Sequence, residues 1–129
     1  MLVGEAAGYR GARVSGIPFT SERQLTGSGP AEASATIVHR VLAELGIEDE
    51  VLLWNAVPTR PHEPDRPYTN RRPTRDEVEA SARFLEGVAR GRLVIAVGRL
   101  AEQATGAPYV RHPSHGGGDA FRQGLARLL

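Results

Sequence analysis

The chain repeats one pattern four times: a short apolar run, a polar stretch, and then a segment with apolar residues at helical spacing. The apolar runs begin at Leu2 and cover residues 51–56, 93–97 and 109–110. Runs of this length predict buried strands, whereas apolar residues three and four apart predict one face of a helix. Alternating strands and helices are typical of a parallel sheet covered on both sides. We therefore predict a three-layer α/β/α fold with a four-stranded parallel sheet.

Helices are expected over residues 30–45, from Thr74 onward, from Gly98 to about Thr105, and at the C-terminus. Thr74 is a favourable N-cap, and Glu77 three residues later completes a capping box. Trp54 points away from Asn55 on the second strand, and we expect it in the core. The inward helix faces are predicted to consist of Ile37, Val38, Val41, Leu42, Leu45, Val78, Phe84, Leu85, Val88, Phe121, Leu125 and Leu128.

Polar clusters follow three of the predicted strands. They are residues 4–11 (GEAAGYRG), Asn55 with the loop 57–73, and residues 112–118 (HPSHGGG). The carboxyl ends of parallel strands form one edge of a sheet, and ligands bind beyond that edge. The pattern thus predicts a single binding site built from these three clusters.

The composition narrows the class of protein. A chain of 129 residues with 40% hydrophobic residues fits one globular domain. The absence of cysteine excludes disulfides, thiolate nucleophiles and cysteine-bound metal clusters, and the histidines lack a metal-ligand spacing. We see no apolar run long enough for a membrane span and no secretory signal, so we expect a cytoplasmic protein.

Basic charge is concentrated in one loop. All 16 basic residues are arginine, and residues 57–75 contain five of them against two acids, a net charge of +3. The remaining 11 arginines face 13 acids, a net charge of −2. This distribution predicts an anionic ligand bound at one place.

Three ordered motifs resemble those of the uracil-DNA glycosylase superfamily. GEAAGYRGARVSGIPFTSERQL resembles the family's first motif, WNAVPTRP with NRRPT resembles its asparagine-bearing strand and loop, and HPSHGG resembles its His-Pro-Ser motif. The resemblance spans nearly the whole chain and implies a hydrolase that removes uracil or another deaminated base from DNA. It also implies one domain over residues 1–129, short at its N-terminus.

The resemblance assigns chemical roles to four residues. Glu5 would orient water and face the cationic sugar, while His112 would donate a hydrogen bond to the departing base. Asn55 would read the edge of the base, and Phe19 would stack on it.

Further residues are expected around them. Gly4 and Ala6 would line the base site, whereas the DNA backbone would be held by Pro113, Ser114, His115, Gly116, Arg71 and Arg72. Alternatively, Arg71 and Arg72 pair with acids of the following helix. No apolar side chain follows His-Pro-Ser to fill the gap left by a flipped base, and the glycines beside His115 are expected to be flexible.

The first motif departs from the family pattern, because Ala7 replaces its usual proline. We expect no metal and no cofactor, a DNA substrate, no membrane partner, and a monomer. Two other functions stay open: a catalytically inactive nucleic-acid-binding relative, and a small nucleotide-binding domain that uses the glycine turns.

Overall fold

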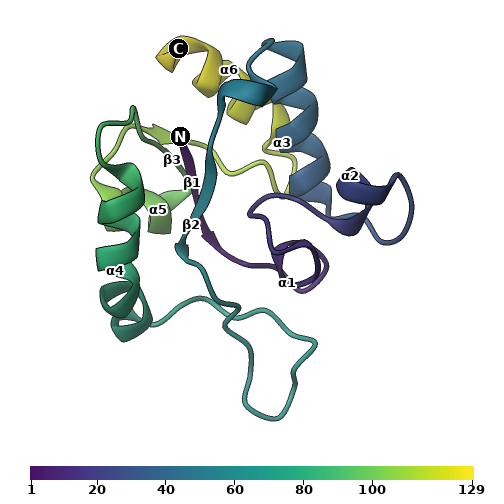
Figure 1. Cartoon of the computed structure of the whole chain (residues 1–129), viewed down its shortest axis with the longest axis vertical. Coiled ribbons are helices and arrows are strands. Elements are labelled where there is room, and N and C mark those ends of the chain that lie inside the picture. The colour runs from purple at the N-terminus through teal and green to yellow at the C-terminus, as the bar shows by residue number, and fades with distance from the viewer.

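A four-stranded parallel sheet forms the centre of the molecule. The structure is a computed structural model that describes all of residues 1–129. The strands are β1 (Leu2–Ala6), β2 (Leu53–Val57), β3 (Ile95–Val97) and β4 (Tyr109–Val110). They lie in the order β2-β1-β3-β4, and every neighbouring pair is parallel (Figure 1). The predicted α/β fold class is confirmed.

Helices cover both faces of this sheet. They are α1 (Ala12–Ser15), α2 (Glu22–Thr26), α3 (Ala33–Glu44), α4 (Arg75–Ala89), α5 (Arg99–Thr105) and α6 (Gly118–Leu128), with a 3₁₀ turn η1 (Glu48–Glu50). The predictions of α3 to α6 are confirmed. Helices α1 and α2 were not predicted, because an element of four or five residues is too short to show a helical period. None of the helices combines the length and the apolar content needed to cross a membrane.

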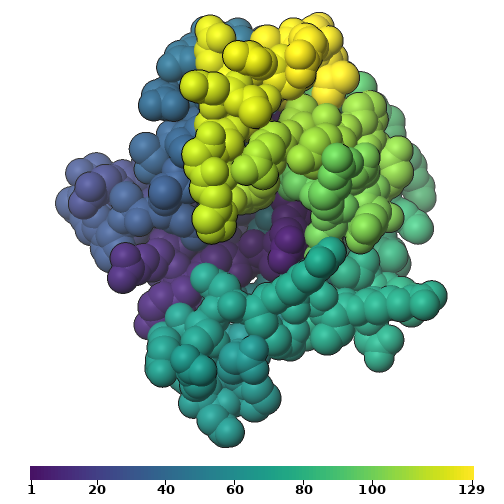
Figure 2. All heavy atoms as spheres, turned by 180° about the vertical axis from the view of Figure 1, so that it is seen from behind, coloured from purple at the N-terminus to yellow at the C-terminus, as the bar shows by residue number.

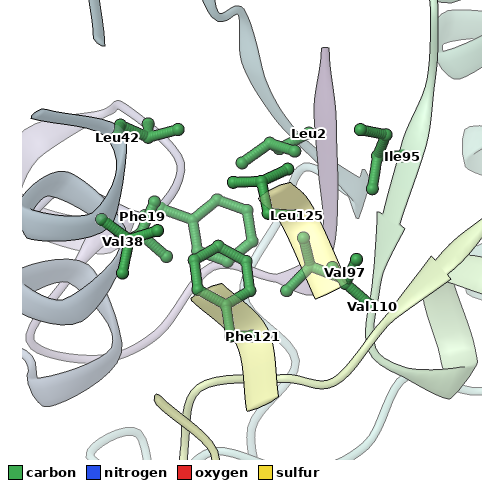
Figure 3. Packing of buried hydrophobic residues seen from close by; sticks show 10 residues of the cluster. Leu2, Phe19, Val38, Leu42, Ile95, Val97, Val110, Phe121 and Leu125 are labelled. Atoms are coloured by element: carbon green, nitrogen blue, oxygen red, sulfur yellow. The ribbon is translucent and has the colours of Figure 1, made fainter. Parts of the chain in front are cut away.

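Alternate strand residues build two separate cores, as the pleat of a strand requires. One core joins the sheet to α3 and α6, and it contains Leu2, Phe19, Val38, Val41, Leu42, Ile95, Val97, Val110, Phe121 and Leu125 (Figure 3). The other joins the sheet to α4 and α5, and it contains Val3, Ala56, Leu85, Ala96, Leu100 and Ala101. The three-layer architecture follows from these two cores.

The prediction for Phe84 was wrong. Its side chain is 51% exposed, whereas Leu85 is buried. One residue along a helix turns a side chain by about 100°, which moves Phe84 off the buried stripe. The guanidinium of Arg83 lies 4.7 Å from the centre of its ring and covers one face. Trp54 is only partly buried, packs against the second core, and leaves its Nε1 enclosed without a hydrogen-bond partner.

Candidate active site at the carboxyl edge of the sheet

A cavity of about 570 Å³ opens beyond the carboxyl ends of the strands. In Figure 2 the purple N-terminal segment is recessed between the teal residues of the long loop and the yellow C-terminal segment. All three polar clusters of the sequence contribute to its wall, as predicted. The predicted site residues that line the cavity are Glu5, Ala6, Phe19, Asn55, Arg71, His112, Ser114 and His115.

Glu5 presents a carboxylate with no partner to this cavity. It lies near the end of β1, half-buried, and forms no hydrogen bond or ion pair within the protein. Burial raises the pKa of the Glu5 carboxyl, because desolvation disfavours the anion, and the nearby Arg72 guanidinium partly opposes that rise. The carboxylate is therefore available to a ligand or to water.

Asn55 supplies a buried amide that also lacks a partner. It pairs with Gly4 in the β1–β2 register and is only 4% exposed, yet no hydrogen bond within the protein engages its side chain. Because Asn55 lines the cavity and its amide has no partner in the protein, its polar atoms are available to a ligand. The donor and the acceptor of the amide stand side by side, a pattern that suits the edge of a nucleobase.

Gly4 makes room for this arrangement. A Cβ at Gly4 would lie 2.4 Å from Cζ of Phe19 and 2.8 Å from Oδ1 of Asn55, so any side chain there would displace both. Gly4 itself is buried and is not part of the cavity wall. The prediction that Gly4 touches the base is corrected: its position behind the two side chains gives it a spacing role.

Phe19 belongs to the core and to the cavity wall at once. Phe19 is 8% exposed and lies among the other residues of the first core (Figure 3). Its ring centre is 6.5 Å from that of the His112 imidazole. Its backbone has φ 53°, a conformation that costs a phenylalanine energy and that its surroundings must hold. The hydroxyl of Ser15 donates to the carbonyl of Thr20 at 2.6 Å, and Thr20 Oγ1 lies 3.0 Å from Nε2 of His39. These contacts fix the turn that presents the ring.

His112 is set up as a neutral hydrogen-bond donor. The backbone N–H of Ser114 donates to Nδ1 of His112 at 3.2 Å, and the Ser114 hydroxyl lies 2.8 Å from the same nitrogen. With Nδ1 as acceptor, the proton of the neutral ring resides on Nε2. Burial lowers the pKa of His112, and the charges of Arg111 and His115 lower it further. The ring is therefore uncharged at neutral pH.

The loop that follows His112 differs from its prediction in one respect. The ring of Pro113 is fully buried, so it anchors the loop and cannot touch a phosphate. Gly117 closes a tight turn: a Cβ there would lie 2.2 Å from the carbonyl oxygen of His112, and the Gly117 N–H donates to the Ser114 carbonyl at 3.1 Å. His115, with φ 52°, and Gly116 are exposed at the mouth of the cavity.

The two adjacent arginines have different partners. Arg71 forms two hydrogen bonds of 2.9 and 2.7 Å with the carboxylate of Glu77, so the alternative pairing holds for Arg71 and its charge is already neutralised within the protein. This pairing raises the pKa of Arg71 and lowers that of Glu77 to about 2. The side chain of Arg72 is exposed and forms no ion pair, so it stays a candidate for a phosphate.

Among the cavity-wall residues that sequence reasoning did not name as site residues are Asn70 and Glu32. Oδ1 of Asn70 accepts a hydrogen bond of 3.0 Å from the backbone N–H of Tyr9, which ties the long loop to the loop after β1. The NRRPT motif contains Asn70 and could have indicated it. Nothing in the sequence around Glu32 distinguishes it from a helix-capping acid. The structure contains no group of three His, Cys, Asp or Glu side chains arranged to hold a metal ion.

Comparison with known proteins gives one family. The sequence model of the Uracil DNA glycosylase superfamily matches residues 1–126. No curated protein sequence matches the chain at a significant level. The family match covers almost all of the chain, including every residue of the cavity.

Proposed function

Because this chain belongs to the uracil-DNA glycosylase superfamily, we propose that it is a DNA-repair glycosylase that hydrolyses the N-glycosidic bond of uracil, or of another deaminated base, in DNA. One observation carries the proposal. A nearly buried amide without a partner, Asn55, shares a cavity with an unpaired carboxylate, Glu5, and a neutral imidazole, His112. These three groups match the needs of base binding, water activation and leaving-group stabilisation.

The reaction separates charge, and each side chain meets one part of it. As the bond between C1′ and the base breaks, the sugar becomes cationic and the base anionic. The Nε2–H of His112 donates to the base oxygen on which the negative charge develops, and this donor is in place beforehand. Water attacks C1′ and passes a proton to Glu5. The departed base anion takes up a proton and Glu5 gives up its own, so the products are the free base and an abasic site.

Base recognition falls to two residues. The base must leave the stack to enter the cavity. Phe19 offers a ring for stacking, and the Asn55 amide offers one donor and one acceptor to the base edge. The backbone would be held by Arg72, by His115 and Gly116, and by the amides at the N-terminus of α6. Action as a cytoplasmic monomer, in a single domain over residues 1–129, stays a prediction.

Single-turnover release of uracil, hypoxanthine and xanthine from single-stranded oligonucleotides tests the proposal. We expect release by the wild type and a loss of about 100-fold or more in Glu5→Gln and His112→Ala, because both groups act on charge present only in the transition state. DNA affinity should change little. Equal rates in wild type and His112→Ala would exclude the role of His112 in stabilising the leaving base. A folded wild type that binds DNA without releasing any base would be an inactive relative of the glycosylases.

A further inference from the structure

The cavity contains a second acid, Glu32. Glu32 is the N-cap residue of α3, but its side chain makes no capping hydrogen bond. Instead it lines the cavity together with Glu5 and is half-buried. The N-cap backbone carbonyl still serves the helix, since it accepts the hydrogen bond of Thr36.

Two glycines leave the space that the Glu32 carboxylate occupies. A Cβ at Gly8 would lie 2.2 Å from Oε2 of Glu32, and a Cβ at Gly11 would lie 2.4 Å from the same oxygen. Both glycines belong to the loop that follows Glu5, so the chain keeps this loop free of side chains where the carboxylate rests. The site of Glu32 is therefore defined from both sides, by α3 and by the loop after β1.

The Glu32 carboxylate has no partner in the protein. Glu44, Glu77 and Glu102 each pair with an arginine. Glu32 forms no ion pair and no side-chain hydrogen bond, although the chain contains 16 arginines. Burial raises its pKa, and no neighbouring cation opposes the rise. A desolvated anion without a partner gains most from a cation that arrives with the ligand.

On the proposed function, the ligand itself supplies that cation, because its deoxyribose becomes positive as the base departs. We propose that Glu32 is a second catalytic carboxylate, which faces the sugar and stabilises its positive charge in the transition state. Glu5 then orients the water, while Glu32 stabilises the charge on the sugar. This inference rests on the proposed glycosylase function.

A binding measurement tests the proposed role of Glu32 without catalytic turnover. Two abasic analogues are placed in the same single-stranded oligonucleotide: a pyrrolidine, whose ring nitrogen is cationic at neutral pH, and an uncharged tetrahydrofuran. We expect the wild type to bind the pyrrolidine more tightly, by about tenfold or more, because a charge complementary to the site adds affinity. Glu32→Gln keeps the shape of the side chain and should lose most of this preference.

The matched control is Glu22→Gln. The Glu22 carboxylate also rests against a glycine, since a Cβ at Gly29 would lie 2.7 Å from it, but Glu22 does not line the cavity. The control should keep the wild-type preference. In uracil release, Glu32→Gln should be about tenfold or more slower in single turnover, with affinity for undamaged single-stranded DNA unchanged.

The outcomes separate the two proposals. Active wild type with an unchanged pyrrolidine preference in Glu32→Gln overturns the role of Glu32 and leaves the glycosylase function standing. A loss of stability without loss of the preference means that Glu32 only supports the loop, which also overturns its role. If the wild type releases no base and does not distinguish the analogues, the proposed function fails, and the role of Glu32 falls with it.

Discussion

Glu5 and His112 share one cavity, and the same cause shifts their pKa values in opposite directions. Burial raises the pKa of the Glu5 carboxyl above its ordinary 4.5 and lowers the pKa of the His112 ring below its ordinary 6.5. In both cases desolvation disfavours the charged form. The proposed chemistry needs Glu5 as an anion and His112 as a neutral donor, so the acid limits activity at low pH.

The first prediction concerns the pH dependence of single-turnover base release. We expect the rate to fall as pH drops through the raised pKa of Glu5, with a midpoint above 4.5, and to stay level from about pH 6.5 to 8 because His112 is already neutral there. Glu5→Gln should be slow at every pH and keep only the part of this limb that comes from protonation of Glu32, whose pKa burial also raises. A rate that rises on acidification below pH 6.5 would mean that His112 acts as a cation, against this account.

Individual site residues differed in how far the sequence could identify them. Glu5, Asn55 and His112 lie at or close to the carboxyl ends of predicted strands, so the parallel topology predicts that they meet at one edge of the sheet. Glu32 and the pairing of Arg71 depend on where a loop places its side chains, and no periodic pattern encodes that. The burial of Pro113 was missed for the same reason.

At the scale of elements, the start of α4 combines a capping box with an ion pair. Thr74 Oγ1 accepts from the Glu77 N–H at 3.2 Å, and the Glu77 carboxylate accepts from the Thr74 N–H at 2.8 Å, which confirms the predicted capping box. The same carboxylate binds Arg71, so one glutamate fixes both the helix start and the end of the long loop. The pKa of Glu77 is lowered to about 2. The largest cause is its hydrogen bonding to Arg71, and the next is the hydrogen bond from the Thr74 N–H.

The second prediction follows from that pKa. A carboxyl whose pKa is lowered in the folded state stabilises the fold above its unfolded pKa, and the stability is lost as pH falls through the folded value. Glu77→Gln should therefore lower the melting temperature at pH 7, and its deficit should shrink between about pH 4.5 and 2. Glu79→Gln, which removes an exposed pair with Arg75, should change little at any pH. A deficit for Glu77→Gln that is independent of pH would show that charge is not its cause.

The third prediction separates the neighbouring arginines of this loop. Arg72 has no partner, so Arg72→Ala should weaken DNA binding without sequence bias and reduce the slope of log K against log salt by about one unit. Arg71→Ala should leave the slope unchanged, since its charge is neutralised by Glu77. Equal slopes in Arg72→Ala and wild type would remove Arg72 from the DNA interface.

The longer elements were predictable, and the shorter ones were not. The capping box at Thr74 predicted the start of α4. The apolar stripes of α3 and α6 predicted those two helices, because a stripe repeats over several turns. Helices α1 and α2 give no such repetition. The prediction that Phe84 is buried failed because packing and the contact with Arg83, and not the helical period alone, determine where a single aromatic residue beside the apolar stripe lies.

At the scale of the whole molecule, the cavity mouth bears on the form of the substrate. The segment from Ser114 to Gly118 contains no apolar side chain, so nothing there can fill the gap that a flipped base leaves in a duplex. His115 is exposed and is the one side chain of the loop able to stack in that gap. The φ of His115 is 52°, and beside it the Gly117 N–H donates to the Ser114 carbonyl.

The fourth prediction is an order of substrates. Unpairing and unstacking a base costs a few kcal/mol, least in a single strand or a mismatch. We expect single-turnover uracil release to be fastest from single-stranded DNA, slower from a U·G mismatch, and slowest from a U·A pair. His115→Ala should affect the duplex substrates most. A U·A duplex cleaved as fast as the single strand would contradict the argument.

The four parallel strands, the three layers and the edge that carries the site were all predictable, since handedness and alternation leave few topologies open. The strand order was not predicted. It places β1 between β2 and β3, and thus brings Glu5, Asn55 and Gly98 to the wall of one cavity.

The account depends most on Asn55, the buried amide that lacks a partner in the protein. The most direct test is single-turnover uracil release by Asn55→Asp, a change that keeps the shape of the side chain but replaces its N–H₂ donor with a second oxygen. If Asn55 reads the base edge, the variant should fold cooperatively, bind undamaged single-stranded DNA as the wild type does, and release uracil at least about 100-fold more slowly, because sites built on hydrogen bonds discriminate strongly. Uracil release at the wild-type rate by a folded Asn55→Asp would contradict the assignment of this cavity as the base site.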